Sequence, residues 1–144
     1  MKPGWTATVL AGAALIALSG CAPPVAVPPA PEGVPGVWAL PDDVSVTSRT
    51  TVLDLDVTRV ECSGGVTGEV LEPKISYEPT RIVITADVVN LHLSEATCPG
   101  NPPVRVRLEL SEPVGKRDLV DGNCVNRKAG QTSFCFTHVR WSGR

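Results

Sequence analysis

The chain has 144 residues, and its 13 basic and 15 acidic side chains give a formal net charge of −2. This length suits one small domain with a flanking segment. The nearly balanced charge leaves no concentrated basic face, which argues against a nucleic-acid partner.

The first 20 residues have the composition of an export signal. Lys2 provides a positive charge, an uncharged apolar stretch follows over residues 7–18, and the small residues Ser19 and Gly20 end the segment. The apolar stretch is shorter than the about 20 residues that a helix needs to cross a bilayer. The pattern therefore predicts a cleaved signal peptide over residues 1–20.

The end of this segment, Leu18-Ser-Gly-Cys21, resembles the lipobox of bacterial lipoproteins. In that family a signal peptidase cuts before the cysteine, which receives a diacylglyceryl thioether and often a further N-acyl chain. The resemblance implies that Cys21 is the lipidated first residue of the mature protein, held on the extracytoplasmic face of the cell membrane. Two or more acyl chains anchor a protein stably. The alternative is a plain secreted protein in which Cys21 is a spare thiol.

Residues 21–42 are expected to form a proline-rich linker, because seven of the 14 prolines fall here. Proline lacks an amide donor and fixes φ, so the segment is expected to form neither a helix nor a strand ladder. An extended chain of this length reaches up to about 60 Å and would hold a domain away from the membrane. A proline-binding partner is the alternative use. Trp38 either docks on the domain or lies in the extended chain.

Residues 43–144 are expected to form one all-β domain. Leu53, Leu55 and Val57 alternate with polar residues, and no sustained helical stripe occurs after the signal. The expected strands cover residues 53–58, 69–77, 81–89, 104–110, 118–120 and 132–141. Six strands separated by Gly/Pro turns favour a small antiparallel β-sandwich, with an immunoglobulin-like architecture as the first choice.

The chain has five cysteines, and setting Cys21 aside for the lipid leaves an even number. An even count in an exported protein predicts two disulfides, although four cysteines allow three pairings. The pairing Cys62–Cys98 with Cys124–Cys135 is favoured. Wide spacings without a CxxC pair argue against a zinc site.

Two segments resemble lipoproteins and exported proteins of high-GC Gram-positive bacteria. One is Cys98-Pro-Gly-Asn-Pro-Pro103 with the strand after it, and the other runs from Leu110 to Cys124. In that family a Glu-Pro-Leu-Gly-Asp-Arg-Xaa-Leu-Val-Asp-Gly run follows a strand; this chain has Val114 for Leu and Lys116 for Asp. The resemblance implies a location and a fold, and no activity. Turn chemistry is the favoured account of the run, with Arg117 and Asp118 expected to pair across a hairpin, and a ligand loop is the alternative.

The candidate binding loop lies between two predicted strands, where two prolines and a disulfide would make it rigid. It consists of Cys98, Pro99, Gly100, Asn101, Pro102 and Pro103. A cap on the sandwich is the alternative role. Arg105 and Arg107, on the outer face of the next strand, are expected to protect a sheet edge, and contact with an acidic envelope polymer is the alternative.

Metal and catalytic sites are not expected. His92 and His138 are the only histidines, and each is expected to be a polar residue in or near a strand, His138 at a core margin beside Phe134 and Phe136. The carboxylates of the acidic group are expected to be solvated, since no Asx-rich loop with a bidentate glutamate supports calcium. That group comprises Asp42, Asp43, Asp54 and Asp56.

No nucleophile elbow, HExxH pair, phosphate-binding loop or dinucleotide fingerprint occurs in the sequence. We therefore expect a membrane-anchored envelope lipoprotein with a non-catalytic binding or structural domain, no cofactor, and an envelope protein or polymer as partner. A small envelope hydrolase with an unrecognised site is the first alternative. A proteinase-inhibitor or ligand-scavenging module is the second.

Overall fold

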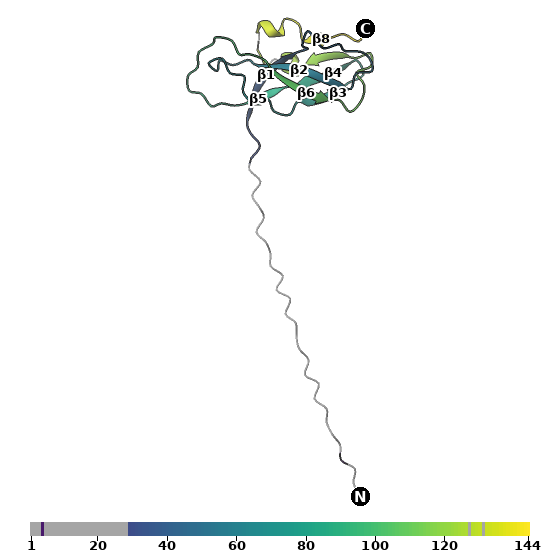
Figure 1. Cartoon of the computed structure of the whole chain (residues 1–144), viewed down its shortest axis with the longest axis horizontal. Coiled ribbons are helices and arrows are strands. Elements are labelled where there is room, and N and C mark those ends of the chain that lie inside the picture. The colour runs from purple at the N-terminus through teal and green to yellow at the C-terminus, as the bar shows by residue number, and fades with distance from the viewer. Residues whose placement is uncertain (1–3, 5–28, 127, 131) are drawn as a thin grey trace.

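The computed structural model describes Gly4 and residues 29–126, 128–130 and 132–144. The described chain forms two four-stranded sheets, in the orders β5-β1-β2-β6 and β3-β4-β7-β8 (Figure 1). The strands are β1 (Gly33–Ala39), β2 (Val52–Arg59), β3 (Lys74–Tyr77), β4 (Arg81–Thr85), β5 (Asp87–Val89), β6 (Val104–Glu109), β7 (Asp118–Asp121) and β8 (Val139–Trp141). All strand pairs are antiparallel except β4 with β7, which is parallel.

The core lies between the two sheets and is built from the alternating residues of the strands. Leu53, Leu55 and Val57 of β2 are fully buried, as the alternation predicts. Leu108 of β6 is also buried and faces Leu53 across the ladder. The prediction of a small all-β fold with two disulfides is therefore confirmed, and the pairs are Cys62–Cys98 and Cys124–Cys135.

Strand β1 corrects the expectation that the linker, residues 21–42, forms no strand ladder. Its segment Gly33–Pro35 pairs with β5, and its segment Gly36–Ala39 pairs with β2. Pro35 is tolerated because it stands where the pairing changes sides, and its carbonyl accepts a hydrogen bond from Val60. Trp38 is fully buried in the core, so this part of the expected linker belongs to the sandwich.

The predicted strand over residues 81–89 is divided between the two sheets. β4 ends at Thr85 and β5 begins at Asp87, so the chain crosses from one sheet to the other at Ala86. The fully buried positions Ile82, Ile84, Ala86 and Val88 keep a period of two through the crossing. The sequence alternation therefore gives no sign of the crossing, and the change of sheet depends on β1, which pairs with β5.

The predicted strand over residues 132–141 is wrong for most of its length. Ser133–Cys135 forms a 3-10 helix, and only Val139–Trp141 forms a strand, β8. A short helix, α1 (Gly122–Val125), precedes this region. α1 lies so close to β4 that a Cβ on Gly122 would come 2.0 Å from the Thr85 hydroxyl oxygen, which explains the glycine.

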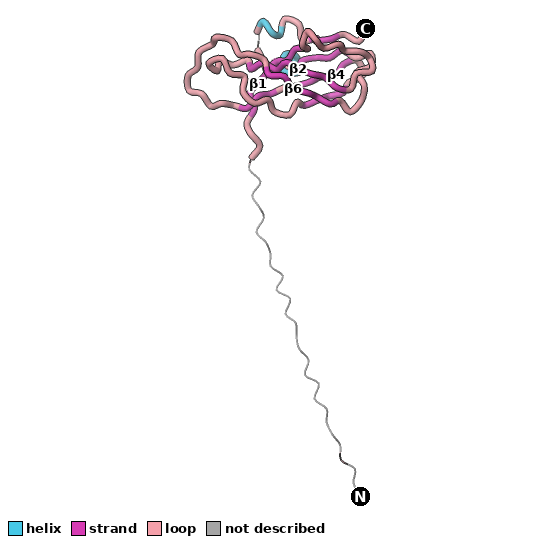
Figure 2. The backbone as a smooth tube through the Cα atoms, in the orientation of Figure 1, coloured by secondary structure: helices cyan, strands magenta, loops and turns pink. Residues whose placement is uncertain are grey.

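The long loops gather at one end of the sandwich. Figure 2 shows these loops in pink extending beyond the strands, on the side where β1 begins. They comprise residues 60–73 and 90–103, which the Cys62–Cys98 disulfide joins. The C-terminal turn that contains Cys135 lies along the upper side of the same view (Figure 1).

Candidate functional site

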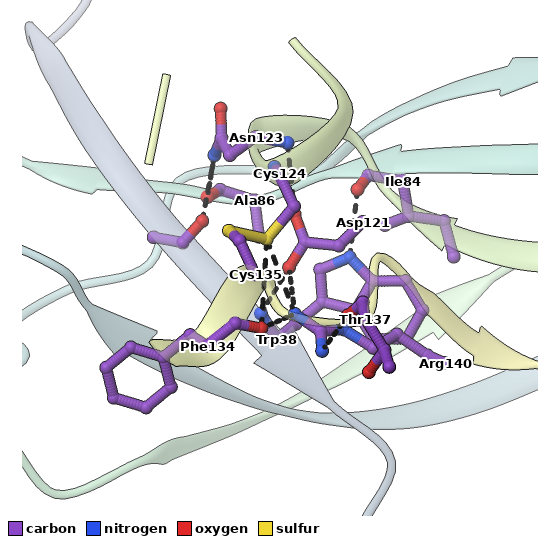
Figure 3. The surroundings of a disulfide bond; sticks show 11 residues. Trp38, Ile84, Ala86, Asp121, Asn123, Cys124, Phe134, Cys135, Thr137 and Arg140 are labelled. Carbon is purple, nitrogen blue, oxygen red and sulfur yellow. Dashed lines mark hydrogen bonds and ion pairs between the residues drawn. A yellow bond between two sulfur atoms is a disulfide. The ribbon is translucent and has the colours of Figure 1, made fainter. Parts of the chain in front are cut away.

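A buried carboxylate organises the C-terminal disulfide region. Asp121 at the end of β7 is 0% exposed, and its Oδ1 accepts hydrogen bonds from the amides of Asn123 (3.0 Å) and Cys124 (3.3 Å), which caps α1. Its Oδ2 accepts from the Trp38 amide (2.9 Å) and from Arg140 (3.0 Å) (Figure 3). One carboxylate thus joins β7, β1, α1 and β8.

Arg140 is the counter-charge of Asp121 and holds the turn before β8. Its side chain is 13% exposed, and its guanidinium donates to the carbonyls of Thr137 (2.8 Å) and Phe134 (3.1 Å). The same nitrogen that contacts Asp121 lies 3.6 Å from the Cys124 sulfur (Figure 3). The pairing with Asp121 offsets part of the desolvation cost of the buried charge, and the two carbonyl contacts fix the backbone on both sides of Cys135.

Asn123 fixes the place where the chain changes sheets. Its side-chain amide donates to the carbonyls of Gly36 (2.8 Å) and Ala86 (2.9 Å) and to the Asp87 carboxylate (3.1 Å). The Ala86 carbonyl also accepts a hydrogen bond from the Gly36 amide (3.0 Å), so Asn123 adds to the contact between β1 and the crossing at Ala86. The Cys124–Cys135 disulfide is therefore backed by a rigid polar network.

The turn held by this network exposes both phenylalanines of the chain. Phe134 is 48% and Phe136 is 85% exposed, and the Phe134 ring points away from the buried cluster (Figure 3). The prediction that His138 lies with them at a core margin is wrong, because the turn breaks the strand alternation and His138 is exposed. Large aromatic rings outside the core are the informative exception to hydrophobic burial.

Phe134 lines two hollows. The larger, of about 500 Å³, lies against β1 and includes Trp38, Pro103 and Arg140 in its wall. The smaller, of about 140 Å³, is lined by Phe134 together with Cys98, Gly100 and Asn101. We call Phe134 and the walls of these two hollows the Phe134 surface. The structure thus brings the loop predicted for binding next to an aromatic residue that the prediction had placed at the core margin.

The predicted loop is held in place by its own side chain. The Asn101 amide donates to the carbonyls of Arg59 (3.1 Å) and Glu61 (2.8 Å), and the Pro102 carbonyl accepts from Thr67 (2.5 Å). Cys98, Pro99, Gly100, Pro102 and Pro103 are exposed, whereas Asn101 is half-buried. A rigid exposed loop pays little ordering entropy when it binds.

Three of the four carboxylates that were expected to be solvated, those of Asp43, Asp54 and Asp56, instead form ion pairs with arginines of β6. Arg105 contacts Asp56 (3.1 Å) and Asp43 (3.3 Å), and Arg107 contacts Asp54 (3.5 Å). The hydrogen bond with Asp56, followed by that with Asp43, raises the pKa of Arg105. Each arginine thus faces carboxylates of its own chain, in keeping with the protection of an edge strand.

Arg117 and Asp118 do not pair across a hairpin as predicted. Arg117 contacts Glu112, and Asp118 accepts a hydrogen bond from Ser142 (2.8 Å) and contacts Arg144 (3.0 Å). Asp118 begins β7, which lies beside β4 and β8, so its side chain meets the C-terminal segment instead. Within the described residues, no group of three or more metal-binding side chains comes together, and His92 and His138 are both exposed.

Cys21 and the predicted signal peptide lie outside the described residues. None of the helices in the described part of the chain is long and apolar enough to span a bilayer. No protein-family description, curated protein or solved structure matches this chain.

Proposed function

We propose that the protein is a lipid-anchored lipoprotein on the extracytoplasmic face of the cell membrane, and that its sandwich is a non-catalytic binding module for another envelope component. The lipobox-like Leu18-Ser-Gly-Cys21 supports the anchor, and the exposure of Phe134 supports the binding role. Aromatic side chains dominate the energetics of protein interfaces when a partner covers them.

The Phe134 surface is suited to a partner because its parts are rigid. The disulfide, Asp121 and Arg140 hold the turn on one side, and Asn101 holds the predicted loop on the other. A preorganised surface loses little conformational entropy on binding. The volume of the larger hollow is sufficient for a small ligand or for a few side chains of a partner protein.

The hydrolase alternative gains little support from Ser63, a buried serine that contacts the predicted binding loop. The oxygen of Ser63 lies 2.5 Å from the Val66 carbonyl and 2.8 Å from the Asn101 side-chain oxygen. Both neighbours are neutral hydrogen-bond acceptors that hold the loop, whereas an activated serine needs a basic partner. We therefore assign Ser63 to the loop scaffold.

The test is photocrosslinking in intact cells, with captured partners identified by mass spectrometry. We expect the wild type to capture a specific partner, Phe134→Ser to lose most of that capture while remaining folded, and Cys21→Ala to lose it through release from the membrane. Val66→Ser is the matched control, since Val66 is 49% exposed and lines neither hollow of the Phe134 surface. Equal capture by Phe134→Ser and wild type would refute the proposal that the Phe134 surface binds the partner.

A further inference from the structure

Arg59, the last residue of β2, is a buried cation that makes no hydrogen bond to Asp121, Asn123 or Arg140. Its side chain is only 2% exposed. Its Nε donates to the Thr67 carbonyl (3.1 Å) and its Nη2 to the Val89 carbonyl (2.5 Å). Both acceptors are neutral, so these bonds orient the guanidinium without compensating its charge.

The charge of Arg59 is only loosely compensated. Within the described residues, the carboxylate that contacts it is that of Glu61, 3.9 Å from Nη1, and the Glu61 side chain is 55% exposed. A buried charge is costly unless an opposite charge also makes hydrogen bonds to it. Asp121 and Arg140, at 3.0 Å, show how closely this fold pairs a buried charge elsewhere.

A polar hollow of about 430 Å³ lies beside this guanidinium. Arg59, Glu61, Asn90 and His92 contribute to its wall. The Asn90 side-chain oxygen accepts from the His92 amide (2.9 Å), which leaves the side-chain NH₂ group of Asn90 as a donor. An arginine flanked by neutral donors is a typical recognition set for an oxyanion.

We propose that this hollow binds a small molecule through an oxyanion group, a carboxylate or a phosphate, which docks on Nη1 of Arg59 with Asn90 as a second donor. The volume is in the range of small-molecule sites. Glu61 is the competitor of this ligand: its exposed side chain moves aside when the oxyanion enters. Phe134 does not line this hollow, although Arg59 and Glu61 also contribute to the smaller hollow of the Phe134 surface.

The competition by Glu61 makes the proposal testable without removing Arg59. We expect inorganic phosphate or N-acetylalanine to shift the Arg59 Nε–H resonance of the full chain saturably, at constant ionic strength set with chloride. Glu61→Gln should bind the same probe about fivefold more tightly, because the oxyanion no longer has to displace the Glu61 carboxylate from Arg59. Fivefold corresponds to about 1 kcal/mol, the upper range for an exposed ion pair. Asn90→Ala should bind it about tenfold more weakly through loss of a hydrogen bond to a charged group.

The two probes distinguish the ligand sources, and either one that saturates supports the site. Glu109→Gln is the matched control, because Glu109 is an exposed carboxylate on β6 that does not line the hollow. Phe134→Ser should leave probe binding unchanged. No saturable shift in wild type and in Glu61→Gln, or an equal tightening by Glu109→Gln, would overturn the proposal. Arg59 would then have only the structural role of joining β2 to the Thr67 loop and to β5.

Discussion

The two disulfide regions use the same covalent bond in different surroundings. Cys62–Cys98 joins two exposed cysteines 36 residues apart, and neutral hydrogen bonds of Asn101 hold the loops around it. Cys124–Cys135 joins residues 11 apart, and Cys124 packs against a buried ion pair. The first bond chiefly restricts long loops, whereas the second closes a turn that buried charges already hold.

The largest expected effect is the loss of the buried carboxylate. Asp121→Ala should lower the free energy of unfolding by about 3–5 kcal/mol, because Arg140 and the Trp38 amide would be buried without a partner. Urea unfolding followed by tryptophan fluorescence measures this change. Asp56→Ala is the control, since its pair with Arg105 is partly exposed and should contribute at most about 1 kcal/mol. Similar losses in both variants would show that the Asp121 network is not a stabilising centre.

Removal of each disulfide tests whether loop length or surroundings decides its contribution. In the chain-entropy relation, Cys62→Ala/Cys98→Ala should cost about 4 kcal/mol and Cys124→Ala/Cys135→Ala about 3 kcal/mol. Equilibrium unfolding of the two double variants in the same denaturant gives the difference. A larger loss for the shorter loop would assign the contribution to packing around Asp121 instead of chain entropy.

Asn101 is the counterpart of Asp121 in the other region, and its removal should be milder. Asn101→Ala should cost about 1–2 kcal/mol, because the Arg59 and Glu61 carbonyls lose a neutral donor near solvent. Hydrogen exchange should show faster opening of residues 98–103 with little change near α1. Uniform acceleration across both regions would contradict the separation between them.

The smallest expected effect lies at the edge of the C-terminal region and depends on pH. The Ser142 hydroxyl, then the Gly143 amide and Arg144, lower the pKa of Asp118. A lowered native pKa contributes stability above the unfolded pKa, and this stability is lost as pH falls through the native pKa. Ser142→Ala should raise the pKa of Asp118 and weaken this dependence, as an NMR titration of the carboxyl carbon would measure. An unchanged pKa would exclude Ser142 as the main cause.

Local pattern was sufficient for the parts of the fold that follow a short period. The alternation at Leu53, Leu55 and Val57 predicted the buried face of β2, and the even cysteine count outside the lipobox predicted two disulfides. Period-two burial works because successive side chains of a strand point to opposite faces. The favoured cysteine pairing was one of three, and the structure confirms it.

Other features were decided only when distant segments met. The sequence predicts that Pro35 lies in a linker. It is part of a strand because β5 pairs with the residues of β1 up to Pro35 and β2 pairs with the residues after it. The sequence predicts that Phe134 lies in a strand. Arg140, which is paired with Asp121, instead holds the Phe134 carbonyl in a turn, and the ring is left exposed. Arg59 continues the alternation of β2, and its side chain is held by the Thr67 carbonyl of a loop and the Val89 carbonyl at the end of β5. Sequence pattern records the preference of each segment, whereas tertiary contacts decide which backbone and charged groups find partners.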